Sequence, residues 1–137
     1  MAQEGGCMCG NIRYTVEGEP VGTALCHCRD CRKISGSTYS SNAIYPEDGF
    51  KLVKGSPKKH VKTADGGNEI TSFFCGDCGS TMWRDTASFA GNKVIKVGTL
   101  DDDNALKTHE PKIELFTPTR VPWVPEIPGA EQKQTMA

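Results

Sequence analysis

Hydrophobic and polar residues alternate with a period of two along much of the chain. In the first such segment Ile12, Tyr14 and Val16 alternate with polar residues, and the pattern ends at a glycine and a proline. This period is typical of strands with one buried face. We therefore predict short strands at 12–16, 21–25, 39–45, 50–53, 59–63, 69–75, 81–84, 93–97 and 113–116.

The segments between these strands contain residues that fit turns, as at 65–68, where the sequence is Asp-Gly-Gly-Asn. One piece lacks the alternation: residues 26–36 predict a loop that enters a helical turn and stops at Gly36. It is the one helical piece that the pattern indicates. Many short strands favour a mainly β, mainly antiparallel fold with very little helix.

The length of 137 residues fits one domain with a single core. A hydrophobic share of 36%, with 15 glycines and 8 prolines, also favours short strands joined by turns. Residues 129–137 lack a core pattern. We therefore predict a zinc-binding domain at 1–128 and a flexible C-terminal tail at 129–137.

The charge pattern argues against nucleic acid and membranes as partners. The 16 basic and 17 acidic residues give a net charge of −1, so no overall field attracts polyanions. The chain has no apolar run of about 20 residues, and its start does not resemble a signal peptide. We expect a soluble, cytoplasmic protein, and in that reducing setting seven closely spaced cysteines favour metal binding over disulfides.

The strongest metal signal is the C-x-x-C pair Cys75 and Cys78, whose flanking glycines allow a tight turn with backbone N–H groups aimed at sulfur. Two cysteines supply half of a tetrahedral zinc site. Cys7 and Cys9 can supply the other half, because residues i and i+2 of an extended segment face the same side. Four thiolates leave zinc no free position, so this site is predicted to be structural. A redox pair or two buried thiols are the alternatives for Cys75 and Cys78.

The remaining cysteines, Cys26, Cys28 and Cys31, form a C-x-C-x-x-C cluster. Three protein ligands leave a position for water or substrate, which is typical of catalytic zinc. Three thiolates make the ion a weak Lewis acid that is suited to binding a further thiol. One alternative is a second structural site closed by His27 or His109, of which His109 is better placed. Another is a metal-free, redox-active cluster.

The cysteines stand within five motifs: GCMCG at 6–10, CHCRDCRK at 26–33, SGS at 35–37, FCGDCGS at 74–80 and GTLDD at 98–102. In order and spacing these motifs resemble the glutathione-dependent formaldehyde-activating enzyme family, from about Gly5 to Trp123. The resemblance implies several coiled antiparallel β-sheets and two zinc ions. It implies the same division of the cysteines into a structural and a second site.

The family reaction that the resemblance implies is the reversible addition of glutathione to formaldehyde, which gives S-hydroxymethylglutathione and is classed with carbon–sulfur lyases. The small-molecule partner would be glutathione, another thiol or a thiol adduct. Relatives that include centromere protein V use the same domain for other ends. A non-catalytic zinc-binding module, or an enzyme with a substrate other than formaldehyde, is therefore the alternative function.

Charged residues beside the three-cysteine cluster are candidates for catalysis and substrate binding. If a zinc-bound thiolate attacks the carbonyl carbon, His27, Asp30 or Arg32 is near enough in sequence to protonate the developing alkoxide. Arg29, Arg32 and Lys33 are candidates for pairing with the carboxylates of the tripeptide. The competing interpretation of each of these charges is a solvated face.

Other conspicuous residues receive structural interpretations. We predict that His60 is exposed and that residues 101–103, three aspartates, form a turn, because cation sites usually spread their ligands over a longer loop. Trp83 and Trp123 are predicted to be core or wall residues.

Overall fold

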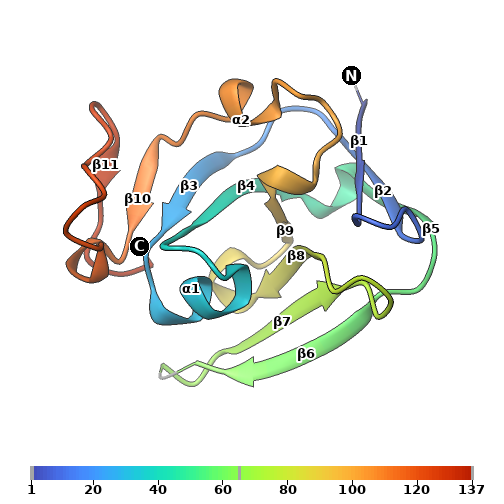
Figure 1. Ribbon diagram of the computed structural model, residues 1–137, viewed down its shortest axis with the longest axis horizontal. Helices are drawn as coiled ribbons and strands as arrows, with labels where there is room; N and C mark the ends of the chain where they lie inside the picture. The colour runs from blue at the N-terminus through green and yellow to red at the C-terminus, as the bar shows by residue number, and fades with distance from the viewer. Residues whose placement is uncertain (1, 65, 137) are drawn as a thin grey trace.

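The computed structural model describes residues 2–64 and 66–136, which form two β-sheets (Figure 1). Three residues lie outside the described part of the chain: residue 1 of the predicted domain, residue 65 of a predicted turn and residue 137 of the predicted tail. The smaller sheet is antiparallel in the order β1-β2-β5, with β1 at Ala2–Gly6, β2 at Arg13–Glu17 and β5 at Phe50–Lys54.

The larger sheet has eight strands in the order β11-β10-β3-β4-β9-β8-β7-β6. Its strands are β3 (Gly22–Cys26), β4 (Ser40–Pro46), β6 (Lys58–Thr63), β7 (Glu69–Phe74), β8 (Thr81–Thr86), β9 (Asn92–Lys96), β10 (Ile113–Leu115) and β11 (Glu131–Gln132). The mainly β, mainly antiparallel fold is confirmed, although β10 runs parallel to both β3 and β11.

The described helices are α1 (Arg29–Ser35) and α2 (Ala105–Thr108), with 3-10 turns at Glu47–Gly49, Ala87–Phe89, Val97–Thr99 and Thr117–Thr119. Helix α1 lies inside the predicted helical piece and ends at Gly36, whose φ of 64° is left-handed. The prediction of a single helical piece was wrong, because α2 has four residues and is too short to show a helical period. Strand β1 was also missed, since its two glycines hide the alternation.

The main hydrophobic core lies between the smaller sheet and one face of the larger one. Because side chains alternate along each strand, Ala43, Tyr45, Ile95 and Trp83 point to this face. Trp83 is 3% exposed, stacks on the Phe73 ring and packs against further aromatic rings of the core. Its predicted core position is confirmed. Trp123 is 75% exposed, so its predicted core or wall position was wrong; it lies after the last 3-10 turn, on the connection from β10 to β11.

Gly5 brings β1 close to this core. A Cβ atom built on Gly5 would lie 2.6 Å from the Tyr14 hydroxyl and 2.7 Å from the Thr99 carbonyl oxygen. Tyr14 is fully buried and shares a 2.7 Å hydrogen bond with the Thr99 hydroxyl, so neither neighbour moves freely. We expect Gly5→Ala to lower the free energy of unfolding by about 1–3 kcal/mol, measured by denaturant titration. The same change at Gly98, whose Cβ would meet no atom within 4 Å, should cost less.

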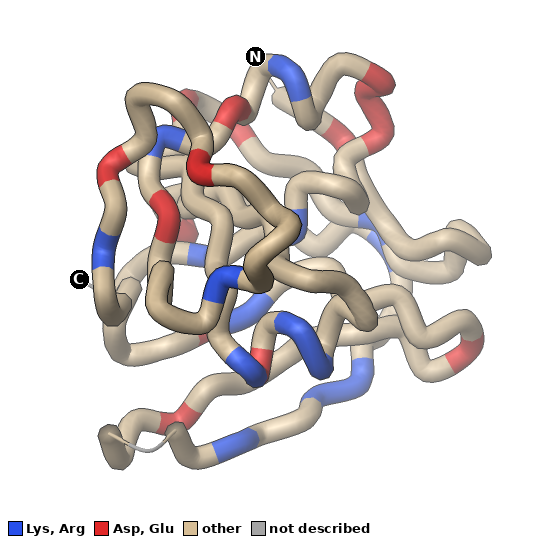
Figure 2. The backbone as a smooth tube through the Cα atoms, turned by 60° about the vertical axis from the view of Figure 1, so that its left-hand side comes forward, with Lys and Arg blue, Asp and Glu red and all other residues tan. Residues whose placement is uncertain are grey.

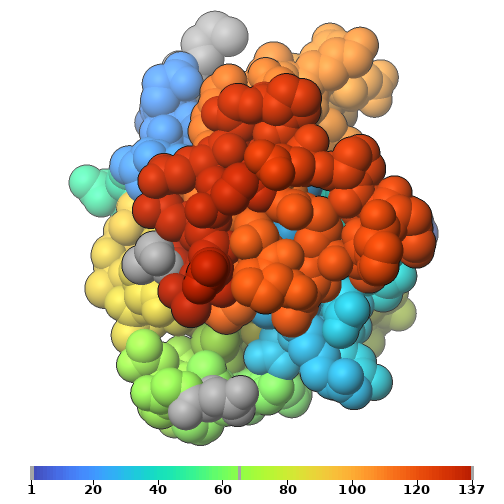
Figure 3. All heavy atoms as spheres, turned by 90° about the vertical axis from the view of Figure 1, so that its left-hand side faces the viewer, coloured from blue at the N-terminus to red at the C-terminus, as the bar shows by residue number. Residues whose placement is uncertain are grey.

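The C-terminal segment differs from the predicted flexible tail. Strand β11 pairs with β10, and the Gln132 side chain donates a 2.8 Å hydrogen bond to Glu114 Oε2. Met136 packs against the cluster of buried residues that includes Cys26 and Cys31. In Figure 3 the end of the chain, in red, covers one side of the molecule above α1 and the β6–β7 hairpin. Tertiary contacts, which a local pattern does not show, hold this segment.

No helix in the described part of the chain is long and apolar enough to span a membrane.

Candidate metal centres

The sulfur atoms of Cys7, Cys9, Cys75 and Cys78 form one cluster, in which all four lie within 4.8 Å of one another. The sulfurs of Cys7 and Cys9 are 3.6 Å apart, and those of Cys9 and Cys75 are 3.7 Å apart. Tetrahedral zinc with Zn–S bonds of about 2.3 Å requires S–S separations of about 3.8 Å. The donor set and its spacing therefore fit a zinc ion with four thiolate ligands.

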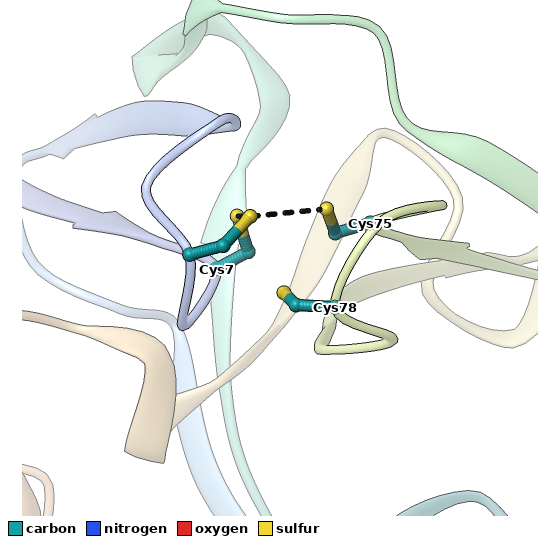
Figure 4. Close-up of side chains that lie close together, drawn as sticks. Cys7, Cys75 and Cys78 are labelled. Atoms are coloured by element: carbon teal, nitrogen blue, oxygen red, sulfur yellow. Dashed lines mark hydrogen bonds between the residues drawn. The ribbon is translucent and has the colours of Figure 1, made fainter.

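Two turns bring these cysteines together (Figure 4). Cys7 and Cys9 lie on the turn from β1 to β2, which is closed by the hydrogen bond from Gly10 N to Cys7 O. The expectation that an extended segment aligns them was therefore wrong, because the chain reverses direction there. Cys75 and Cys78 lie on the turn from β7 to β8, as the flanking glycines predicted.

Backbone and hydroxyl groups surround these sulfurs with donors. Ile12 N donates to Cys7 Sγ at 3.3 Å, and Asp77 N donates to Cys75 Sγ at 3.4 Å. The Ser80 side chain and backbone lower the pKa of the Cys78 thiol to about 5. Such contacts stabilise thiolates, the form in which cysteine binds a metal.

The sulfurs of Cys26, Cys28 and Cys31 form a second cluster, again within 4.8 Å of one another. Cys26 ends β3, Cys28 is the N-cap of α1, and Cys31 lies in the first turn of that helix. Cys31 N donates to Cys28 Sγ at 3.3 Å, so the helix start fixes this spacing. Hydrogen bonds with Cys26 and Cys28 lower the pKa of the Cys31 thiol. Hydrogen bonds with Cys28 and Cys31 raise the pKa of the Cys26 thiol.

His27 does not join the cysteines that flank it. Its Nε2 lies 2.7 Å from Glu114 Oε1, and both side chains are fully buried on the side of β3 away from the sulfurs. Glu114 also accepts hydrogen bonds from Ile127 N at 2.9 Å and from Gln132, and Arg120 lies 3.3 Å away. Although burial alone raises it, these bonds hold the pKa of Glu114 at about 2. This placement contradicts His27 as a fourth ligand and as the acid beside the substrate.

His109 also lies away from the three-cysteine cluster. Its Nε2 is 2.6 Å from the Tyr45 hydroxyl, and its Nδ1 is 2.8 Å from the Ala105 carbonyl oxygen. These contacts indicate that Nδ1 carries the proton and donates to the carbonyl oxygen, whereas the Tyr45 hydroxyl donates to Nε2. The alternative in which His109 closes a second structural site was therefore wrong.

The charged candidates on α1 separate into two groups. Asp30 and Lys33 line a groove between α1 and the strands that follow, where Asp30 pairs with Lys62. His60 lines the same groove and is exposed, as predicted. Arg29 is exposed and Arg32 half-buried, without an ion pair among the described residues, which agrees with a solvated face. Asp101 pairs with Arg13 in the predicted turn at 101–103.

Sequence reasoning missed two cations, Arg84 and Lys96, which line one cavity together with Cys26 and Cys31. Burial lowers the pKa of Lys96 to about 8, although the nearby cysteines oppose this shift. Lys96 stands opposite in phase to the core residues Ile95 and Val97, and Arg84 stands opposite in phase to Trp83. That phase was the available signal, but it equally describes a residue that faces water.

Comparison with known proteins adds a family and a fold. The sequence model described as glutathione-dependent formaldehyde-activating enzyme matches residues 2–119. The crystal structure of a Rhodobacter sphaeroides protein, a structural genomics target, is similar with a TM-score of 0.61 and 20% sequence identity. The alignment covers 79% of this chain and 96% of that one. At that identity the likeness supports the fold alone.

Proposed function

Because the chain belongs to the glutathione-dependent formaldehyde-activating enzyme family, we propose that it is a zinc-dependent carbon–sulfur lyase acting on glutathione or another thiol adduct. The observation that carries this proposal is the unequal pair of cysteine clusters. One cluster offers four sulfurs, which complete a tetrahedral site, and the other offers three beside a cavity. The second cluster is where a substrate thiol would bind.

Cys26, Cys28 and Cys31 would hold the reactive zinc. With three protein ligands, a zinc ion held there would leave one position for a substrate thiol, whose pKa it would lower so that a thiolate exists at neutral pH. Cys26 and Cys31 are each 4% exposed, which keeps water from two of the three sulfurs.

The proposed reaction joins the thiol sulfur to the carbonyl carbon of formaldehyde. The π-electron pair of the carbonyl moves to oxygen, which gains a proton in place of the one that the thiol loses, so the product is a hydroxymethyl thioether. Lys96 lines the cavity together with Cys26 and Cys31, so its ammonium group is placed to supply that proton. Asp30, the earlier candidate, is engaged with Lys62.

The test is an NMR exchange measurement of glutathione, formaldehyde and their hydroxymethyl adduct. We expect the zinc-loaded protein to accelerate their interconversion above the spontaneous rate. Cys28→Ser should abolish the acceleration and remove one zinc equivalent while the far-ultraviolet circular dichroism stays unchanged. No acceleration by a wild-type protein that contains two zinc ions would instead support a non-catalytic zinc-binding module or another substrate.

A further inference from the structure

A small cavity beside the three-cysteine cluster has two cationic side chains in an otherwise apolar wall. Its volume is about 50 Å³, enough for a few water molecules or one carboxylate group. Apart from Arg84, Lys96, Asn42 and Thr86, its lining consists of cysteines and apolar residues: Ala24, Cys26, Cys31, Ile44, Ile70, Phe89, Val94, Leu115 and Met136. Among the described residues, no carboxylate lines it. The cavity is therefore suited to a negatively charged group.

The strand register places these cations on the same face as the cysteines. Lys96 pairs with Asn42, and Asn42 pairs with Ala24, which is two residues before Cys26. In the neighbouring row, Arg84 pairs with Val94. Alternation along each strand turns these side chains away from the main core. The arrangement follows from the pairing of β3, β4, β9 and β8 and does not depend on a flexible loop.

The negative charge of the three-cysteine cluster explains why Lys96 lies beside it. Its Nζ donates a 2.6 Å hydrogen bond to Asn42 Oδ1, and the nearby cysteine sulfurs favour its charged form. Three thiolates and Zn²⁺ carry a net charge of −1, which one ammonium group balances.

Arg84 has no such explanation. It is 8% exposed, and its side chain makes one hydrogen bond to a described residue, from Nε to Ser72 Oγ at 2.9 Å. An arginine guanidinium has further donors on its two terminal nitrogens, in a geometry that matches a carboxylate. These terminal nitrogens are unpaired among the described residues but not fully buried, so an anion that enters from outside can reach them. Arg84 therefore lacks an anionic partner within the described chain.

Arg84 also connects the cavity with the wider groove outside. That groove, of about 540 Å³, is lined by Arg84 together with Lys33, His60, Lys62 and Asp30. Figure 2 shows positive residues on α1 and along the nearby strand β6. The groove is thus more cationic than the chain as a whole, whose net charge is −1. A substrate lying in it can reach Arg84 with an acidic group.

We infer that Arg84 binds a carboxylate of the substrate and so selects an acidic thiol over a neutral one at the three-cysteine site. The inference rests on the proposed function and names its substrate class. Glutathione, which carries two carboxylates, belongs to this class. Arg84 acts here as a specificity-determining residue, whereas Lys96 balances the charge of the cysteines before the reaction and is the proposed proton donor during it.

The test is calorimetric binding of S-methylglutathione to the zinc-loaded protein. This probe keeps both carboxylates but has no free thiol, so its affinity reports the anion contacts without the reaction. We expect Arg84→Gln to weaken binding roughly ten- to hundred-fold, because a charge-assisted hydrogen bond is lost. Arg84→Lys should recover part of the affinity. Lys51→Gln, which removes an exposed charge on β5, should change it less than about two-fold.

Esterifying both carboxylates of the probe should weaken binding to wild type about as much as Arg84→Gln, and should have little further effect on that variant. The inference is wrong if the diester binds wild type as well as the acid, if R84Q binds the acid as tightly as wild type, or if wild type binds neither probe. Zinc content and thermal unfolding show whether R84Q is folded, and R84K supplies a second comparison. Charge-selective binding without acceleration of adduct formation would refute the proposed function and leave the anion site standing.

Discussion

Replacing Cys75 with serine is expected to leave most of the protein unfolded and, with zinc in both clusters as proposed, to lower the zinc content below two equivalents per chain. Cys75 is 1% exposed, and its cluster joins the β1–β2 turn to the β7–β8 turn, which are more than sixty residues apart in the chain. Zinc binding by a structural site contributes roughly 10–16 kcal/mol, as much as the whole stability of a typical domain. Circular dichroism and metal analysis of the purified variant measure both effects.

The matched control for this variant is Cys28→Ser at the other cluster. Cys28 belongs to a local segment from the end of β3 to α1, so its loss opens no long-range link. We expect that variant to stay folded and to lose the other zinc equivalent. Equal thermal stability of the two variants would contradict the assignment of the four-cysteine site as the structural one.

The second large effect is expected at Glu114, the fully buried carboxylate between His27 and the C-terminal segment. Glu114→Ala removes an acceptor that Ile127 N, Gln132 and His27 share, and it leaves Arg120 without its buried partner. Breaking a buried pair from one side costs about 3–5 kcal/mol. We expect a loss of unfolding free energy of that size in urea titrations at pH 7. Glu110→Ala, which removes an exposed carboxylate, should change stability by less than about 0.5 kcal/mol.

The contribution of Glu114 should depend on pH in a defined direction. Its pKa of about 2 in the folded protein lies below the ordinary value of 4.5, so the folded state favours the ionised form. The stabilisation is therefore present above about pH 4.5 and is lost as the pH falls towards 2. The stability difference between wild type and Glu114→Gln should be constant from pH 6 to 8 and should narrow below pH 4.5. A difference that grows on acidification would show that Glu114 is protonated in the native state.

The same residue illustrates why part of the candidate site was not predictable. His27 stands between two cysteines, and local sequence suggests that it belongs to their chemistry. Its partner Glu114 lies 87 positions later, on a strand that the chain reaches after a long connection and pairs in parallel with β3. Local patterns carry no information on such a pairing. The C-terminal segment was misjudged for the same reason, because β11 and Gln132 are held by β10 and Glu114.

The sequence by itself determined the strands with clear alternation, the helical piece before Gly36 and the grouping of seven cysteines into two clusters. The strands, the helical piece and the spacing within each cysteine motif are local features, which act within about ten residues. The grouping of distant motifs followed instead from the four ligands that a closed zinc site needs. Only the tertiary structure decided which histidines stay outside the clusters, and which face of each strand meets the core. A lysine or arginine at the strand positions that alternate with core residues is predicted from the sequence to be exposed. Only the tertiary structure shows whether another layer covers it. Arg84 and Lys96 became part of the site because β3, β4, β9 and β8 pair in one register beside the three cysteines.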